Sequence, residues 1–204
     1  MPVYPDAVIM VFCKAPIPGQ VKTRLIPYLS ASEAAQLHCE LAELTLATAT
    51  QSGLCDVELW CSPYIEHPYF AQLARHYPIK LKMQDGADLG ERMLNAFDDA
   101  LKKYKNVVLI GCDCPSLTAD DLAQALTALA DNKACALGPA EDGGYYLLGL
   151  KRLIPELFED IPWGTSDVLN LTRAKLRSMS IFGFETATRW DLDTVEDLMR
   201  YRKR

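Results

Sequence analysis

The sequence predicts a three-layer α/β domain in which helices cover both faces of a mostly parallel sheet. Short apolar runs alternate with longer segments of helical spacing, few long gaps separate them, and no repeat or low-complexity block interrupts the pattern. With 204 residues, of which 50% are hydrophobic, the chain can bury one sizeable core. We therefore expect a single domain over residues 1–204.

Local patterns predict each element in chain order. Apolar or alternating runs predict strands at residues 7–12, 56–61, 79–83, 106–111, 134–137, 145–150 and 180–184. Helical spacing predicts helices at residues 30–50, within 63–76, and at 88–104, 116–132, 166–177 and from 194 onward. Ser30 followed by Glu33 is a typical N-cap pattern for the first helix. The caps expected for later helices are Asp88, Thr165 or Ser166, and Asp193.

Charge and cysteine content narrow the class of protein. A net charge of −6 argues against broad binding to nucleic acids or anionic membranes. Seven cysteines form an odd set without a C-x-x-C pair, so reduced thiols in a cytoplasmic protein are expected. Cys112 and Cys114 are closest in sequence, but no histidine near them completes a zinc-ligand set. No leader-like start or membrane-length apolar run is present, so export or insertion is not expected.

A basic loop follows the first predicted strand and suggests an anion site. Lys14, Lys22 and Arg24 can neutralise phosphate oxygens, and these cations stand out in an acidic chain. Gly19 permits a positive φ or a close approach to an anion, while Pro18 stiffens the loop. The spacing is not that of a Walker loop or a dinucleotide fingerprint. A solvated basic loop without a ligand is the alternative.

Asp113 lies just beyond the apolar strand at residues 106–111. Open α/β sheets place ligands at the carboxyl ends of their strands, and a carboxylate there suits Mg²⁺ or Mn²⁺ beside phosphates. The alternative role of Asp113 is to cap the helix that follows Pro115.

Two later segments could form an acceptor site. Asp142 precedes Gly143 and Gly144, a pattern that lets a ligand approach an acid closely but also fits a hairpin turn. Trp163 could stack on a substrate ring, and Arg92 could reach a phosphate. A packed tryptophan and a solvated arginine are the alternatives.

Several motifs together resemble nucleoside-triphosphate transferases: residues 22–27 (K-T-R-L-I-P), 111–115 (G-x-D-x-P) and 191–198 (D-L-D-T-x-E-D-L). With residues 14–25, 88–93 and 141–146, the set is similar to a bacterial family of uncharacterised glycosyltransferase-A-like proteins (DUF2064 type), related to 2-phospholactate and molybdenum-cofactor guanylyltransferases. The resemblance covers nearly the whole chain. Residues 12–16 (F-C-K-A-P) replace the L-A-G-G opening of many nucleotidyltransferases, and Asp113 is single where many glycosyltransferases have D-x-D. The single acid favours nucleotidyl transfer.

The resemblance implies a nucleotide-diphospho-sugar transferase (GT-A, Rossmann-like) fold and a metal-dependent transferase with Mg²⁺ or Mn²⁺. We expect nucleotidyl transfer from a nucleoside triphosphate to a small phosphorylated acceptor; glycosyl transfer from a nucleotide sugar and a non-catalytic nucleotide-binding protein are the alternatives. A homodimer is a further candidate assembly.

The expected nucleotide-binding residues are Lys14, Pro18, Gly19, Lys22, Thr23, Arg24 and Arg92. The expected acceptor-binding residues are Gly143, Gly144, Tyr145 and Trp163. The expected catalytic residues are Asp113, Asp142 and Lys22, with Asp113 and Asp193 as metal ligands.

Overall fold

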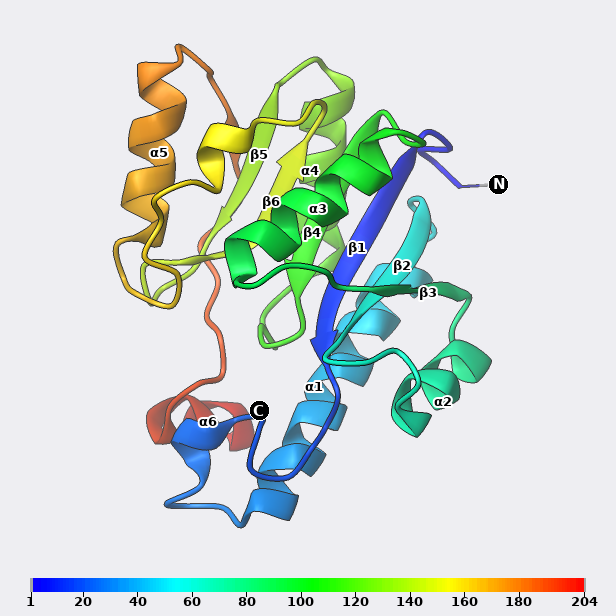
Figure 1. Ribbon diagram of the computed structural model, residues 1–204, viewed down its shortest axis with the longest axis vertical. Coiled ribbons are helices and arrows are strands. Elements are labelled where there is room, and N and C mark those ends of the chain that lie inside the picture. The colour runs from blue at the N-terminus through cyan, green and yellow to red at the C-terminus, as the bar shows by residue number, and fades with distance from the viewer. Residues whose placement is uncertain (1, 204) are drawn as a thin grey trace.

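The computed structural model describes residues 2–203 and confirms the predicted three-layer α/β class, with one sheet between two layers of helices (Figure 1). The strands are β1 Ala7–Lys14, β2 Asp56–Ser62, β3 Ile79–Met83, β4 Asn106–Gly111, β5 Cys135–Pro139, β6 Tyr145–Leu150 and β7 Phe184–Glu185. The helices are α1 Ala31–Gln51, α2 Pro68–His76, α3 Leu89–Leu101, α4 Ala119–Ala130, α5 Val168–Ser178 and α6 Val195–Arg202, with short 3₁₀ helices η1 Thr23–Leu25 and η2 Pro155–Leu157.

The strand order within the described chain, β3-β2-β1-β4-β6-β5-β7, places a topological switch beside β1. The chain moves from β1 through β2 to β3 on one side, and then crosses to β4 on the other side of β1. These four strands are parallel, whereas β6 is antiparallel to both β4 and β5. Ligands of open α/β sheets bind where the strand order reverses, at the carboxyl ends of the strands. The ends of β1 and β4 are therefore the expected place for a site.

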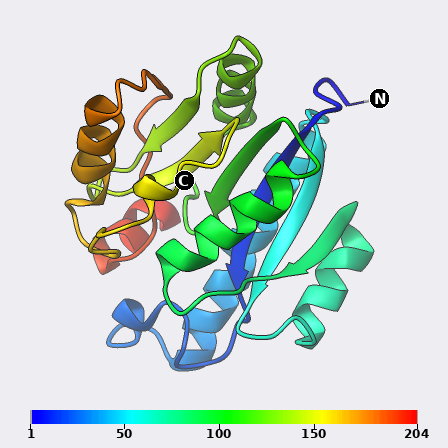
Figure 2. The same ribbon diagram turned by 45° about the horizontal axis from the view of Figure 1, so that its top comes forward.

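Alternate residues of β1 face two different helix layers, which explains its continuous apolar sequence. Ile9 and Val11 pack in a cluster with residues of α1, α2 and α4, whereas Val8 and Met10 pack with residues of α3 and α5. A smaller cluster joins Leu25 of η1 to Leu198 of α6. Figure 2 shows α6 beside the start of α1, which brings the last helix back to the loop that follows β1.

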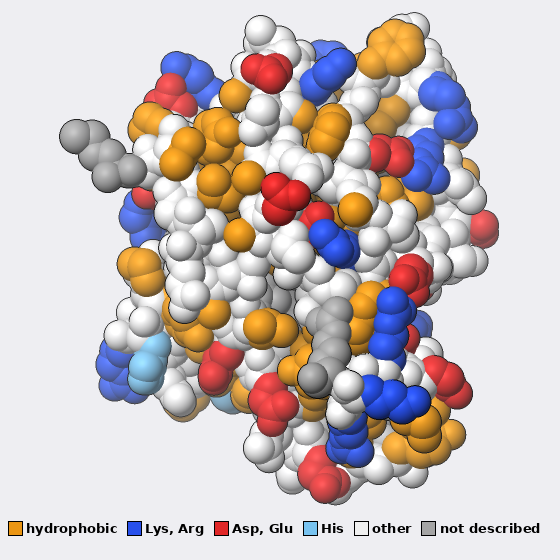
Figure 3. Space-filling view, turned by 180° about the vertical axis from the view of Figure 1, so that it is seen from behind, with side chains coloured by type: hydrophobic (Ala, Val, Ile, Leu, Met, Phe, Trp, Pro, Cys, Tyr) orange, Lys and Arg blue, Asp and Glu red, His pale blue; other side chains and the backbone are white. Residues whose placement is uncertain are grey.

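Acidic and basic side chains are interspersed over the face of the protein opposite α3 (Figure 3). None of the helices within residues 2–203 is long and apolar enough to cross a membrane.

Two of the expected helix caps are confirmed. Ser30 and Glu33 form a reciprocal capping box at the start of α1, and Asp88 accepts a hydrogen bond from the Glu91 backbone at 2.9 Å. The expected cap at Asp193 is wrong because Thr194 caps α6. The Asp193 carboxylate instead contacts Lys22, so it is not free to bind the helix start.

The start of α5 and the strand before α6 also differ from the sequence-based expectation. Asp167, not Thr165 or Ser166, precedes α5, and its side chain makes no capping bond. The strand expected at residues 180–184 is reduced to β7. Ser180 has a φ of 56°, and the Ile181 backbone N–H donates to the Leu176 carbonyl, so this segment closes the end of α5 instead.

Candidate functional site

Two adjoining cavities lie at the carboxyl ends of β1 and β4. The larger has a volume of about 570 Å³, and we call it the basic cavity. Its charged and polar lining includes Lys14, Lys22, Thr23, Arg24, His38, Arg92, Asp113 and Asp193. The smaller has a volume of about 220 Å³, and we call it the aromatic cavity. Its lining includes Leu89, Met93, Asp142, Tyr145, Trp163 and Asp191. Phe12, Leu89 and Gly111 line both cavities, so the two spaces are neighbours.

A buried lysine joins two carboxylates at the base of the basic cavity. Lys22 Nζ lies 2.6 Å from Asp113 Oδ1 and 3.2 Å from Asp193 Oδ1, and it also donates to the Leu192 carbonyl. The Lys22 side chain is only 4% exposed, whereas the Asp113 side chain is 47% exposed. Asp113 Oδ1 is buried, so the exposed surface of this side chain belongs to its other atoms. Lys22 has a φ of 49°, a left-handed conformation that is uncommon outside glycine and typical of functional sites.

The charges in this group stabilise one another. Burial acts to raise the pKa of Asp113, but the positive charge and the hydrogen bond of Lys22 hold that pKa below its usual value. Burial acts to lower the pKa of Lys22, but Asp113 and Asp193 hold it above its usual value. Asp113 is therefore an ionised carboxylate and Lys22 a charged ammonium group at neutral pH.

The segment between β7 and α6 carries Asp191 and Asp193 to the site. The Leu192 backbone N–H donates to the Asp113 carbonyl at 2.8 Å, so this segment lies directly against the residues that follow β4. Ser116 makes hydrogen bonds to both the N–H and the carbonyl of Trp190. These bonds fix the segment relative to Asp113.

A partly exposed arginine anchors the same segment to α4. Arg189 Nε and Nη2 donate to the two carboxylate oxygens of Asp121, each at 2.9 Å, and the Asp121 side chain is 1% exposed. Asp121 also completes the capping box of Thr118 at the start of α4. The helix cap of α4 is thus Thr118, and the alternative of Asp113 as that cap is excluded.

We expect Arg189→Met to lower the free energy of unfolding by about 2–4 kcal/mol, because it leaves the buried Asp121 carboxylate without its bidentate partner. The segment that carries Asp193 should also loosen, so a ligand that contacts Asp193 in the basic cavity should bind more weakly. Chemical denaturation and ligand titration measure the two effects. Arg173→Met, which breaks the more exposed pair with Glu185, is the control and should change stability by at most about 1 kcal/mol. Equal losses in both variants would contradict the anchoring role of Arg189.

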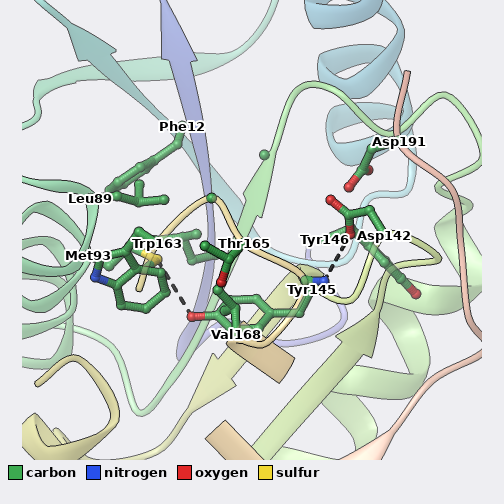
Figure 4. A pocket seen from close by; sticks show the side chains of 14 residues that line it. Phe12, Leu89, Met93, Asp142, Tyr145, Tyr146, Trp163, Thr165, Val168 and Asp191 are labelled. Carbon is green, nitrogen blue, oxygen red and sulfur yellow. Dashed lines mark hydrogen bonds between the residues drawn. The ribbon is translucent and has the colours of Figure 1, made fainter. Parts of the chain in front are cut away.

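Asp142 and Asp191 lie at one end of the aromatic cavity, with their carboxylates directed toward each other (Figure 4). Burial raises the pKa of Asp191 to about 7, and the negative charges of Asp142 and Asp113 add to this effect. Asp142 is exposed and accepts a hydrogen bond from the Gly144 backbone at 2.9 Å. This end of the cavity can therefore bind a cation or accept protons from hydroxyl groups.

Aromatic and apolar side chains form the other end of the aromatic cavity. Tyr145 and Trp163 pack edge to face with ring centroids 6.5 Å apart, and the Tyr145 hydroxyl is directed at Met93 Sδ (Figure 4). Phe12 and Leu89 complete the surface. An apolar wall opposite a pair of carboxylates suits a small ligand with both a flat or apolar face and polar groups.

The structure brings most of the expected nucleotide-binding residues together. Lys14, Lys22, Thr23, Arg24 and Arg92 all line the basic cavity. The Arg24 side chain is 67% exposed and contacts Asp193 at 3.4 Å, so it remains free to move toward an anion.

Three of the expected site residues, Pro18, Gly19 and Gly143, do not line either cavity. Pro18 and Gly19 are exposed and do not line the cavity; Gly19 has a φ of 84°, so it serves the shape of the loop. Gly144 lines the aromatic cavity, but Gly143 does not. Gly143 has a φ of 90° and lies against the backbone of Ser166, where a side chain would collide. It therefore allows the loops before β6 and α5 to meet.

Two site residues were not among those expected from the sequence. Asp191 lines the aromatic cavity, and the D-x-D spacing to Asp193 is the signal that could have identified it. His38 is buried in α1, and its Nδ1 lies 3.9 Å from Asp113 Oδ1. Nothing in the local sequence around His38 indicates this contact.

Comparison with solved structures gives matches along the whole chain. A protein from Desulfovibrio desulfuricans G20, described as a candidate nucleotide-diphospho-sugar transferase, is 32% identical, with a TM-score of 0.87 over 98% of this chain and 87% of that one. CMP:2-keto-3-deoxy-manno-octonic acid synthetase in complex with CTP is 16% identical, with a TM-score of 0.58 over 97% of each chain. Rv0371c from Mycobacterium tuberculosis H37Rv, in complex with manganese, is 16% identical, with a TM-score of 0.57 over 98% of this chain and 100% of that one. The last two similarities concern the fold alone.

Comparison with curated proteins gives no match. A family model matches residues 45–165, which span α1 to the loop before α5. The description of this family is an uncharacterised protein conserved in bacteria, DUF2064. The match covers more than half of the chain, and the resemblance found in the motifs is thereby confirmed. The chain belongs to the DUF2064 family of bacterial proteins and has a nucleotide-diphospho-sugar transferase-like fold.

Proposed function

We propose that this protein is a divalent-metal-dependent transferase that moves a nucleotidyl group from a nucleoside triphosphate to a small phosphorylated acceptor. The observation that carries the proposal is the Lys22–Asp113–Asp193 group at the topological switch point, within a cavity that several further cations line. The similarity to a candidate nucleotide-diphospho-sugar transferase at 32% identity supports a nucleotide donor.

The residues at this point fit Mg²⁺ or Mn²⁺. Asp113, Asp193 and the Leu192 carbonyl all direct oxygen atoms at one ammonium group, and hard divalent cations prefer oxygen ligands. The exposed half of Asp113 leaves one carboxylate edge available. Asp113 and Asp193 would hold the ion, and the ion would neutralise charge on the phosphates of the donor and of the departing pyrophosphate.

The chain's own residues bind and orient the donor. Lys14, Arg24 and Arg92 line the basic cavity and would contact the triphosphate, and the Arg92 Nε donates to the Gly86 carbonyl at 3.0 Å, which orients its side chain. Lys22 can turn from its carboxylate partners toward the α-phosphate, where negative charge develops in the transition state. An oxygen of the acceptor phosphate bonds to the α-phosphorus, the bond to the bridging oxygen breaks, and pyrophosphate leaves with that electron pair.

The acceptor is proposed to occupy the aromatic cavity. This cavity adjoins the basic one through Phe12, Leu89 and Gly111, so a ligand there can reach the α-phosphate of a donor in the basic cavity. Holding both reactants in place is the main contribution to rate that such a site makes.

Glycosyl transfer from a nucleotide sugar is the second candidate. It is favoured by the carboxylate pair Asp142 and Asp191 beside an aromatic wall, since either carboxylate could take the proton of an acceptor hydroxyl.

A thermal-shift screen with nucleoside triphosphates and nucleotide sugars, each with and without Mg²⁺ or Mn²⁺, tests both candidates. A ligand that binds the folded state raises the melting temperature. Stabilisation by triphosphates with metal, followed by pyrophosphate release in the presence of phosphorylated acceptors, is the expected result. Stabilisation by nucleotide sugars alone would establish glycosyl transfer instead. A flat screen would contradict both and favour a protein without this chemistry.

We expect Trp163→Ala to impair acceptor use more than donor binding. The indole packs against Tyr145 and against the buried cluster that includes Met93, and it is absent from the lining of the basic cavity, so its loss removes acceptor surface and some core packing but no donor contact. The KM for the acceptor should rise about 10-fold or more, while the Kd for the nucleotide changes less than about 3-fold. Phe182→Ala, which removes an aromatic side chain that is 80% exposed, is the control. An equal loss of nucleotide binding in the Trp163 variant would place the nucleotide in the aromatic cavity.

A further inference from the structure

Two thiols and an imidazole meet beneath the basic cavity. Cys13, His38 and Cys112 are all buried, and one ligand atom from each lies within 4.8 Å of the other two. All three residues line the basic cavity, so the group can be reached from it.

The fold places these residues together although they are far apart in sequence. Phe12 pairs with Gly111 in the register of β1 and β4, and the next residues are Cys13, near the end of β1, and Cys112, directly after β4. His38 reaches the same point from α1, and its Nε2 lies 3.7 Å from Cys13 Sγ. A tetrahedral zinc ion with a Zn–S bond of about 2.3 Å and a Zn–N bond of about 2.0 Å holds its sulfur and nitrogen ligands roughly 3.5 Å apart. The observed separation is close to that value.

A second partner is already in position for the histidine. His38 Nε2 faces Cys13 and also donates a hydrogen bond to the Lys14 carbonyl at 2.9 Å, while Nδ1 lies 3.9 Å from Asp113 Oδ1. Zinc binding through Nε2 would replace the bond to Lys14, and the ring proton would move to Nδ1, beside Asp113. Imidazole ligands of zinc bind the ion through one nitrogen and donate the other N–H to a carboxylate or carbonyl. Burial lowers the pKa of His38, which keeps the ring neutral and able to bind a metal.

We propose that Cys13, His38 and Cys112 form a binding site for one thiophilic divalent cation, Zn²⁺, separate from the oxygen-ligand site at Asp113 and Asp193. This inference goes beyond the proposed function and does not depend on it. Three protein ligands leave a fourth coordination position, and the basic cavity is the space from which water or a ligand atom reaches it.

Cys112, and not Cys114, belongs to the group of thiols around His38. Cys112 and Cys114 are neighbours in sequence, but the Cys114 thiol lies 3.5 Å from the Ser116 hydroxyl and is not part of the group. The histidine that seemed to be missing is His38, more than seventy residues earlier in the chain.

Zinc binding at this site has to release protons. The neighbouring Cys112 thiol and burial raise the pKa of the Cys13 thiol well above its usual value, so Cys13 is protonated in the metal-free protein. Each thiol that becomes a ligand loses one proton to solvent and gains one bond to the ion, so affinity should rise with pH.

Cobalt titration of the metal-free protein is the first test, because Co²⁺ takes the place of Zn²⁺ and is coloured. The expected result is a sulfur-to-cobalt charge-transfer band in the near ultraviolet that saturates at one ion per chain. One equivalent of Zn²⁺ should abolish the band, and a large excess of Mg²⁺ should leave it unchanged. No nucleotide or turnover is needed, so the outcome is independent of the proposed transferase activity. Absence of the band, with Co²⁺ bound or not, would overturn the proposal.

Matched cysteine variants then locate the ion. Cys13→Ala and Cys112→Ala should each weaken Zn²⁺ binding by more than about 100-fold, whereas Cys114→Ala removes a buried thiol outside the group and should change it less than about 3-fold. Circular dichroism verifies that each variant is folded. If a cysteine variant does not fold, His38→Gln takes its place and should weaken Zn²⁺ binding in the same way. The charge-transfer band of the unchanged protein then remains the evidence for sulfur ligands. Unchanged affinity in a folded Cys13 or Cys112 variant would show that zinc binds elsewhere.

Discussion

Asp113→Asn is expected to reduce metal-dependent nucleotide binding and turnover by at least about 100-fold while the protein stays folded. The amide keeps the size of the side chain and one acceptor oxygen, but it removes the negative charge that a hard divalent cation requires. Lys22 keeps its contacts with Asp193 and the Leu192 carbonyl, so its charge is not left without a partner. Calorimetric titration with nucleotide and Mn²⁺, together with a pyrophosphate-release assay, measures the effect.

Asp120→Asn is the matched control for this variant. Asp120 lies in the first turn of α4, is exposed, and bonds only to Gln124 among the contacts of its side chain described in the structure. Its replacement should leave nucleotide binding unchanged. The helix cap at Thr118 does not involve Asp113, so a large loss of stability in the Asp113 variant is not expected. Full metal-dependent activity in Asp113→Asn would exclude Asp113 as a metal ligand.

The fold could be predicted from the sequence because most of its elements are defined locally. The continuous apolar run of β1 is buried on both faces, and Ser30 and Glu33 form the reciprocal bonds that their spacing indicates. The prediction places the cap of α6 one residue too early, because it takes Asp193 and passes over the local pattern of Thr194 followed by Asp197. Thr194 and Asp197 form a reciprocal capping box, and the Asp193 carboxylate contacts Lys22 from the loop after β1.

The candidate site could be predicted only in part. Asp113 and the cations after β1 follow the ends of neighbouring strands, and parallel strands bring such ends to one edge of the sheet. Asp191 and His38 reach the site through a long connection and from the buried face of α1, so their places depend on tertiary packing. The direct ion pair between Lys22 and Asp113 also depends on tertiary packing. Because of this ion pair, replacing Lys22 should affect metal binding as well as nucleotide binding.

Lys22→Met is expected to tighten Mn²⁺ binding about 10-fold, which corresponds to about 1.4 kcal/mol, and to lower turnover by at least about 100-fold. The ammonium group of Lys22 lies between the carboxylates of Asp113 and Asp193, so it competes with a divalent cation for the same oxygens. Methionine is similar in size but uncharged, and it leaves two carboxylates that repel each other until a cation binds. Without metal, this repulsion should lower the free energy of unfolding by about 1–3 kcal/mol, less than for a fully buried pair because both carboxylates are partly exposed. Added Mn²⁺ should then raise the melting temperature of the variant more than that of the unchanged protein.

Arg24→Met separates this effect from a general loss of positive charge. Arg24 also contacts Asp193, at 3.4 Å, but its side chain is 67% exposed and it makes no contact with Asp113 that would compete for that carboxylate. Its replacement should alter the Mn²⁺ affinity less than about 3-fold and should weaken nucleotide binding through the loss of one phosphate contact, worth about 1.5–3 kcal/mol. If Lys22→Met weakened Mn²⁺ binding, or if both variants tightened it equally, the cation would not share the Lys22 position. The metal site would then have to be sought beside Asp142 and Asp191, the other pair of facing carboxylates described in the structure.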